Sequence, residues 1–196
     1  KKDNSIYRQV DKAIKKEENR IVDKRNREGI YQVTIRGIKR KYLSNRSTAD
    51  ILSTETGSYS YYGVMGIRMY VLNNSGKKEV TAYGGAKPRV WDYSKKSPIQ
   101  SDKYYGILTV NASRKFVVTK NHLKDENAEV VFNVQANLGE SDLFFNDNYR
   151  WNQISINLSD LDFSKNKSVD KKLTVVEEGK EQKHKLDVHI KIEKIK

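Results

Sequence analysis

Cysteine is absent from the 196-residue chain, and only three histidines occur. The lack of cysteine excludes a disulfide scaffold and thiol catalysis. The histidines are His122, His184 and His189, and the last two lie five residues apart in an alternating apolar–polar pattern. That spacing places them on opposite faces of a strand, where they cannot share a metal ion. We therefore expect no metal site and no cofactor.

Long apolar runs are also absent, and the only prolines are Pro88 and Pro98. No run approaches the roughly 18 residues that a membrane-spanning helix needs. The sequence begins Lys1-Lys2 without an initiator Met, which we interpret as a trimmed fragment whose anchor lies outside it. The abundant Asn, Lys, Tyr and Ile are typical of exported Gram-positive proteins. We expect a location at the extracellular face of the membrane, in the cell-wall zone.

Positive charge dominates the composition. Lys and Arg number 38 against 25 Asp and Glu, which gives a net charge of +13. Such a field attracts anions of several kinds, including acidic proteins, lipid headgroups, wall polymers and nucleic acid. The basic residues are spread along the chain without the compact arginine-rich arm of many nucleic-acid binders. We expect an acidic protein partner and no nucleic acid.

Residues 4–27 have the periodicity of an amphipathic helix. Ile6, Val10, Ile14 and Ile21 recur at helical spacing, and the other face is almost wholly charged. The pattern predicts a helix packed on one face of a sheet. The alternative is a juxtamembrane stalk whose basic face lies near a membrane surface.

From residue 30 onward the apolar period changes to two, most clearly near the C-terminus, where Leu186, Val188, Ile190 and Ile192 alternate with polar residues. We predict a single domain over 1–196, of α+β class and mainly β. It has a curved antiparallel meander of about seven strands over 28–196, with short turns between them. The candidate strands are 30–42, 59–73, 78–93, 104–119, 128–138, 150–158, 171–177 and 184–194. Gly84-Gly85 predicts a bulge within the third of these, the prolines predict an edge or bend, and further turns are expected at 46–52 or 140–147.

Catalytic constellations are scarce. Asp187 and His189 share a strand face, but a solvated surface explains them as well as a dyad does. The run Asp160–Ser164 with Asn166 has alternating oxygen ligands, yet it lacks the glycine and terminal glutamate of a calcium loop, and we interpret it as polar loop. We expect no catalytic residues and no enzymatic activity.

Aromatic residues suggest binding instead. Tyrosines gather in the central strands beside basic residues, a combination that suits a protein-binding face and, as a second choice, a wall-polymer face. The short glycine-aromatic signature of RNA-binding sheets is missing. The connection 142–151, rich in Phe, Tyr and Trp, is either a lid on the core or an interface. The candidate partner-binding residues are Arg68, Tyr70, Tyr61, Tyr83, Lys87, Arg89 and Trp91.

Strand parity limits that set. Tyr61 and Tyr70 differ by an odd number, so a regular strand puts only one of them on the binding face. Arg68 shares parity with Tyr70, which makes these two the preferred pair. The opposite face, with Met65, Ile67, Met69 and Val71, is predicted to be core.

The charged helix 5–27, the tyrosine-rich strands around 58–70 and 78–93 and the C-terminal hairpin 171–194 together resemble the soluble domain of TipC-type immunity proteins of streptococci. The resemblance implies a membrane-held protein that faces the cell wall. It also implies neutralisation of a toxin exported by a type VII secretion system, through the concave face of a curved sheet. Alternatives are a secreted immune-evasion factor and a wall-polymer-binding β domain.

Overall fold

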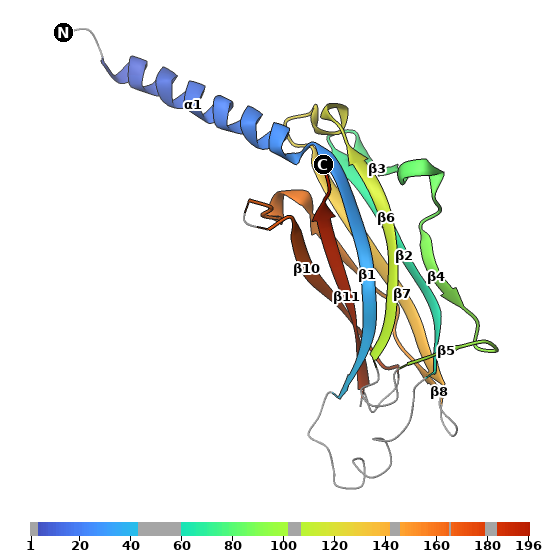
Figure 1. Ribbon diagram of the computed structural model, residues 1–196. Coiled ribbons are helices and arrows are strands. Elements are labelled where there is room, and N and C mark those ends of the chain that lie inside the picture. The colour runs from blue at the N-terminus through green and yellow to red at the C-terminus, as the bar shows by residue number, and fades with distance from the viewer. Residues whose placement is uncertain (1–3, 43–59, 102–106, 142–145, 165, 179–183) are drawn as a thin grey trace.

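The computed structural model describes residues 4–42, 60–101, 107–141, 146–164, 166–178 and 184–196. The described chain is mainly β, with one long helix and three short 3₁₀ turns (Figure 1). The elements are α1 (Asn4–Arg27), β1 (Gly29–Tyr42), β2 (Ser60–Asn73), β3 (Gly76–Val80), η1 (Tyr83–Gly85), β4 (Arg89–Tyr93), β5 (Ile99–Gln100), β6 (Ile107–Val118), η2 (Lys120–Leu123), β7 (Glu129–Ser141), β8 (Asn146–Asn148), β9 (Asn152–Asn157), η3 (Leu158–Asp160), β10 (Ser168–Val176) and β11 (His184–Lys194).

The strands form two antiparallel sheets. One has four strands in the order β10-β11-β1-β6, and the other has seven, built on the order β3-β2-β7-β8. In the second sheet β4 and β5 also pair with β2, and β9 pairs with β7. The predicted antiparallel pairing is confirmed, but the prediction of one meandering sheet of about seven strands is wrong. β1 and β2, and likewise β6 and β7, are consecutive strands that belong to different sheets.

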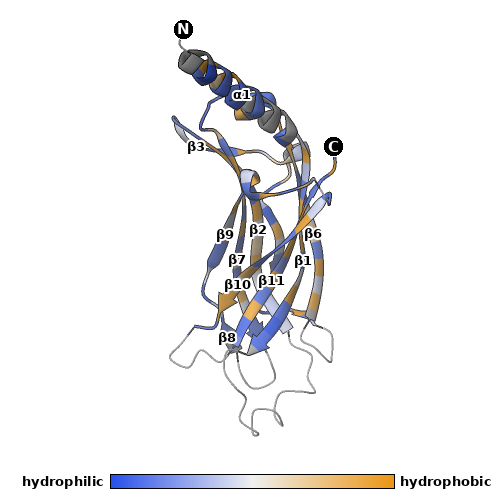
Figure 2. Cartoon of the chain, turned by 90° about the vertical axis from the view of Figure 1, so that its left-hand side faces the viewer, coloured by the Kyte–Doolittle hydropathy of each residue, from blue (hydrophilic) through white to orange (hydrophobic). Residues whose placement is uncertain are grey.

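The two sheets pack face to face over one core. Phe132 of β7 lies between Tyr31 of β1 and Phe116 of β6, with ring centroids 5.6 Å and 6.1 Å away. The buried core takes residues from both sheets, and apolar residues recur along their long strands (Figure 2). A sheet with a mainly apolar face must be covered. Here a second sheet covers it, where the sequence suggested the helix.

The helix does not cover either sheet. α1 occupies Asn4–Arg27 and projects away from the end of the sheets at which β1 begins (Figures 1 and 2). The side chains of residues 8–19 are all exposed, including half of the surface of Val10 and of Ile14, and of the other described side chains only Arg27, at the end of the helix, is partly covered. The predicted packing on a sheet face is therefore wrong, because the other sheet occupies that position.

Two details of the strand prediction are also corrected. The expected strand 78–93 is broken into β3 and β4 by η1, where Gly84 and Gly85 take positive φ values of 73° and 70°. These glycines form a tight turn and not a bulge, since two successive left-handed residues cannot continue a strand. β5 and β8 were not predicted, because strands of two and three residues are too short to show an alternating sequence pattern. The expected turn at 46–52 lies outside the described residues, as do residues 142–145 of the connection 142–151, whose described part includes β8.

Candidate binding site on the seven-stranded sheet

β2 presents opposite faces to the core and to the outside, as its alternation predicts. Met65, Ile67, Met69 and Val71 are buried, and Met65 and Met69 have no exposed surface at all. The even-numbered residues between them point outward and are only partly covered. Parity along this 14-residue strand is therefore read correctly from the sequence, and Arg68 and Tyr70 lie together on the outer face.

The segment before and along β4 is fixed at one edge of this face. The Pro88 carbonyl accepts a hydrogen bond from the Ile67 amide at 2.9 Å. From the other sheet, the Arg114 guanidinium donates from Nε to the Lys87 carbonyl at 2.8 Å and from Nη2 to the Arg89 carbonyl at 3.0 Å. A guanidinium suits this task because its donors are held in a rigid fork. Arg114 thereby joins the edges of the two sheets.

An open hollow of about 280 Å³ lies between this edge and β7. Gly66 is part of its lining, and a Cβ added there would meet the Pro88 carbonyl group, with the oxygen at 3.6 Å and the carbon at 3.9 Å. The hollow is smaller than the pockets that hold cofactors or drug-sized ligands, and it matches one bulky side chain. Its lining consists of Val64, Gly66, Arg68, Pro88, Arg89, Gln135, Ala136, Asn137 and Trp151.

Trp151 is the exposed apolar wall of the hollow, with 55% of its surface accessible. It directly precedes β9, which begins at Asn152 opposite Ala136 of β7. An indole left this exposed offers a large flat face and one N–H donor to a partner.

Each arginine of the hollow already has an acidic partner. Arg68 Nη1 lies 2.8 Å from Glu79 Oε2, and Arg89 Nη1 lies 2.8 Å from Asp92 Oδ2. The buried Nε of Arg68 has no hydrogen-bond partner among the described residues. These exposed ion pairs are worth little to stability, but they hold the guanidinium groups in place. The local field is consequently less basic than the sequence suggests.

A ladder of amides extends the polar surface beyond the hollow. Asn133 is 2% exposed, and its amide nitrogen donates to Gln153 Oε1 at 3.2 Å and to Ser155 Oγ at 3.1 Å. Gln135 Nε2 donates to Asn133 Oδ1 at 2.9 Å. This network fixes the amide of Gln135, which lines the hollow, in a defined orientation.

The remaining predicted residues divide between core and surface. Tyr61 is fully buried and Trp91 is 6% exposed, so these two pack in the core and their prediction as partner anchors is wrong. Trp91 packs against Tyr93 with ring centroids 5.0 Å apart and ring planes tilted by 53°. Tyr83 is 68% exposed on η1, outside the lining of the hollow, and Lys87 lines a neighbouring hollow that opens beside η1.

Tyr70 belongs to the same outer face but not to the hollow. The ammonium group of Lys77, from β3, lies 3.7 Å from the centre of its ring. This cation–π contact covers one face of the tyrosine. Tyr70 and Arg68 remain neighbours on the surface, and both would have to exchange an existing contact on binding.

Several residues of the hollow were missed by the sequence reasoning. Gln135 and Asn137 alternate with buried residues of β7, so their exposure was visible in the pattern, but amides carry no specific binding signal. Trp151 closes the aromatic run 142–151, which the sequence left open between lid and interface. Only the three-dimensional register brings them beside Gly66.

The weaker candidates have structural partners. Asp187 Oδ1 accepts a hydrogen bond from Thr174 at 2.7 Å, and its other oxygen faces two lysines, while His189 is exposed on the same face. Asp162 Oδ1 accepts from the Ser164 amide at 2.8 Å, which closes a local turn. Within the described ranges there is no group of three or more His, Cys, Asp or Glu residues placed to hold a metal ion.

A larger hollow of about 450 Å³ lies at the end of α1, between the start of β1 and the residues that follow η3. Its wall includes Tyr31, whose hydroxyl donates to the Arg27 carbonyl at 2.8 Å. Burial raises the pKa of Tyr31 to about 12, although the positive charge of Arg27 acts to lower it. Burial also lowers the pKa of Lys194 on the same wall.

Comparisons with known proteins add little. No protein-family profile matches the chain, and no curated protein matches it. One solved structure, titled "CC2D1B coordinates ESRCT-III activity during the mitotic reformation of the nuclear envelope", aligns with 10% identity and a TM-score of 0.34. The alignment covers 85% of this chain and 55% of that one. No helix among the described residues is both long and apolar enough to cross a membrane.

Proposed function

We propose that this chain is a non-enzymatic binding domain that recognises a protein partner on the outer face of the seven-stranded sheet. The observation that carries the proposal is the hollow over Gly66, walled by the exposed Trp151 and by two arginines. Binding hot spots are enriched in Trp and Arg, and they centre on pockets that take one anchoring side chain. A rigid rim of ion pairs and fixed amides surrounds this pocket.

Because this chain has a net charge of +13, we expect its protein partner to be acidic. Long-range attraction speeds the encounter of oppositely charged proteins, while buried rings set how slowly they separate. An acidic side chain of the partner can reach the exposed part of the Arg68 guanidinium in exchange for its contact with Glu79. An apolar group of the partner can occupy the space above Gly66 against Trp151.

The resemblance to TipC-type immunity proteins supplies the biological context of the proposal. The chain would act at the extracellular face of the membrane and neutralise a secreted antibacterial toxin. The sheet face that binds would then be the outer face described here. A secreted immune-evasion factor or a wall-polymer-binding domain is the alternative use of the same surface.

A peptide library displayed on phage tests whether this surface binds protein. Selection on the immobilised chain should enrich acidic sequences with an aromatic or long aliphatic residue. Gly66→Leu adds a bulky side chain to the lining of the hollow, and its Cβ is tolerated because the nearest atom, the Pro88 carbonyl oxygen, is at ordinary contact distance. The enriched peptides should lose binding to this variant. Peptides that bind Gly66→Leu as well as the unaltered chain would contradict the proposal.

The toxin assignment has its own test. A gene for a large exported toxin should lie beside the gene for this chain. Co-production of the two proteins should then protect a susceptible Gram-positive host, and Gly66→Leu should abolish the protection while the variant stays folded. Protection that is retained by Gly66→Leu, or no protection by the unaltered chain, would contradict the immunity assignment.

A further inference from the structure

The outer face of the four-stranded sheet is a second charged surface, and none of the residues proposed above belongs to it. Along β11 the even-numbered residues from Leu186 to Ile192 are buried, so the odd-numbered ones point outward. The register with β1, β6 and β10 extends this face over the whole sheet. Its basic members are Arg36, Lys39, Lys41, Lys115, Lys172, Lys185 and Lys191, and its acidic members are Asp170, Asp187 and Glu193.

Two lysines of this face contact one buried carboxylate, and two more lie beside these residues in the strand register. Asp187 has no exposed surface, and its Oδ2 lies 3.0 Å from Lys41 Nζ and 3.3 Å from Lys172 Nζ. In the strand register Lys39 is directly opposite Asp187, and Lys185 is directly opposite Lys41. The single negative charge of Asp187 is therefore outnumbered by the positive charges of the lysines near it.

The surplus positive charge is available to a ligand. Lys39 and Lys185 form no ion pair within the described part of the chain, and both side chains are partly exposed. Lys41 and Lys172 keep 42% and 46% of their side-chain surface accessible in spite of Asp187. Lysine ammonium groups are compact, mobile charges that suit phosphate groups without fixed geometry.

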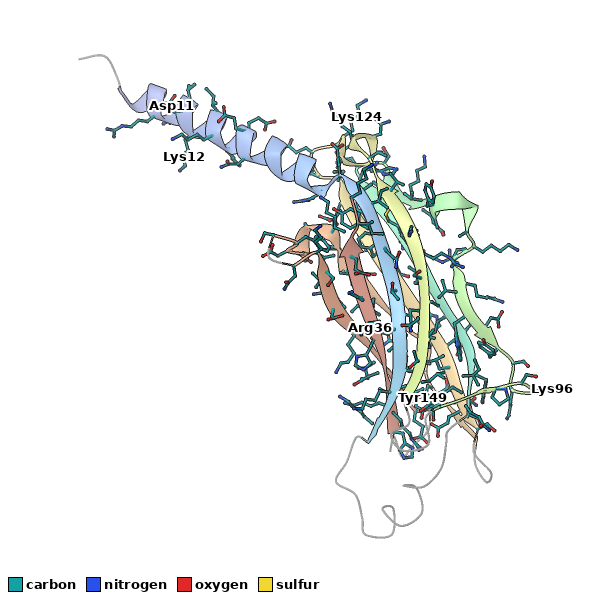
Figure 3. The ribbon with its side chains drawn as sticks, in the orientation of Figure 1. Asp11, Lys12, Arg36, Lys96, Lys124 and Tyr149 are labelled. Atoms are coloured by element: carbon teal, nitrogen blue, oxygen red, sulfur yellow. The ribbon has the colours of Figure 1, made fainter. Side chains whose placement is uncertain are left out.

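The shape and chemistry of this face select among anions. The outward residues of the described strands include no aromatic side chain on which a nucleic-acid base could stack. The charges spread along strands of up to 14 residues, an extended surface and not a cradle for one small anion (Figure 3). An extended lysine-rich surface matches a plane of phosphate headgroups.

We propose that the outer face of the four-stranded sheet binds the surface of a membrane that contains anionic lipids, through the lysines around Asp187. Each lysine held near an anionic bilayer raises partitioning roughly five-fold. Because the two sheets pack face to face, this contact leaves the outer face of the seven-stranded sheet turned away from the membrane. The two surfaces can therefore be occupied together.

Sedimentation with vesicles tests the proposal on the full chain. Binding to vesicles that contain phosphatidylglycerol should be strong at low ionic strength and should fall steeply with salt. Lys39→Gln with Lys185→Gln should lower partitioning about 25-fold, as two lost lysines predict. The control is Lys95→Gln with Lys96→Gln, which removes the same charge from the exposed turn between β4 and β5 (Figure 3). The control should fall much less.

Asp187→Asn supplies a result of opposite sign. Asparagine keeps an acceptor for Thr174 but frees Lys41 and Lys172, so vesicle binding should tighten by several-fold. Circular dichroism must show that the variant keeps the native fold, because an unfolded chain with a net charge above +13 would also bind anionic vesicles. Equal losses in the Lys39/Lys185 pair and in the control pair would overturn the proposal. So would tight binding to soluble polyphosphate or duplex DNA without binding to the anionic vesicles.

Discussion

Arg114 in one sheet holds Arg89 in the other, with its Nη2 donating to the Arg89 carbonyl oxygen at 3.0 Å. Its Nε makes a second hydrogen bond, to the Lys87 carbonyl at 2.8 Å. The candidate hollow therefore depends on a residue that does not line it. Arg114 is a positioning residue, because it places the backbone from which the Arg89 side chain reaches the surface.

Arg114→Ala should loosen this edge. Loss of the two hydrogen bonds to the Lys87 and Arg89 carbonyls should cost about 1–2 kcal/mol of unfolding free energy. Exchange of the Ile67 amide, which donates to the Pro88 carbonyl, should accelerate more than exchange in β1 or β11. Hydrogen exchange followed by NMR measures both. The neighbouring Lys115→Ala is the control, and equal protection of Ile67 in the two variants would contradict the positioning role.

Ile67 and Arg68 are adjacent residues of β2, but Ile67 faces the core and Arg68 faces the outside. Ile67 is 1% exposed, so Ile67→Asn should cost more than about 3 kcal/mol and bring the domain close to unfolding. Arg68→Asn removes an exposed ion pair and should cost less than about 1 kcal/mol. Urea denaturation of both variants checks the parity of β2. Similar destabilisation by the two substitutions would contradict it.

This pair also shows what sequence can and cannot predict. Alternation assigns each residue of a long strand to a face, so the buried side of β2 and the polar side of β11 followed directly from the sequence. Which sheet a strand joins depends on pairing between distant segments, and alternation carries no information about it. That is why two stacked sheets were mistaken for one. The same limit hid Trp151, whose position beside Gly66 comes from the register of β9 on β7.

Arg40 and Glu140 form a buried ion pair between the sheets, at 3.0 Å and with 6% and 2% of their side chains exposed. The Tyr149 hydroxyl donates to the other Glu140 oxygen at 2.8 Å, at the end of the sheets away from α1 (Figure 3). Burial, followed by the charge of Glu140, raises the pKa of Tyr149, so the hydroxyl remains a donor.

Glu140→Gln should cost about 3–5 kcal/mol because it removes the buried carboxylate that lies 3.0 Å from the buried Arg40 guanidinium. The exposed pair Arg68 and Glu79 is the matched control, since Glu79→Gln removes the same kind of partner at 2.8 Å in solvent. That change should cost less than about 1 kcal/mol. Thermal and urea unfolding compare the two. Equal costs would show that the buried pair is not a tie between the sheets.

Asp187 should make the free energy of unfolding depend on pH in the acid range. Burial raises its pKa, but the hydrogen bond from Thr174 and the two lysines together outweigh burial, so the pKa lies below its usual value. A lowered pKa in the folded state contributes stability that is present above the unfolded value, near about 4, and is lost as the pH falls through the folded one.

The unaltered chain should therefore be more stable than Asp187→Asn at neutral pH, and the difference should shrink as the pH falls below about 4. Urea denaturation over a pH series measures this difference. If the difference in unfolding free energy between the unaltered chain and Asp187→Asn stayed constant down to acid pH, it would contradict the pairing of the Asp187 carboxylate with lysine.

The most direct test of the proposed function is the dissociation rate of the selected acidic peptides from single-site variants. Trp151→Ala removes the exposed wall of the hollow, and Tyr83→Ala removes the still more exposed ring on η1, outside the hollow. Surface plasmon resonance should show dissociation at least about ten-fold faster from Trp151→Ala, the loss expected for a hot-spot residue. Tyr83→Ala should dissociate as the unaltered chain does. An unchanged rate for Trp151→Ala in a folded protein would contradict binding at this face.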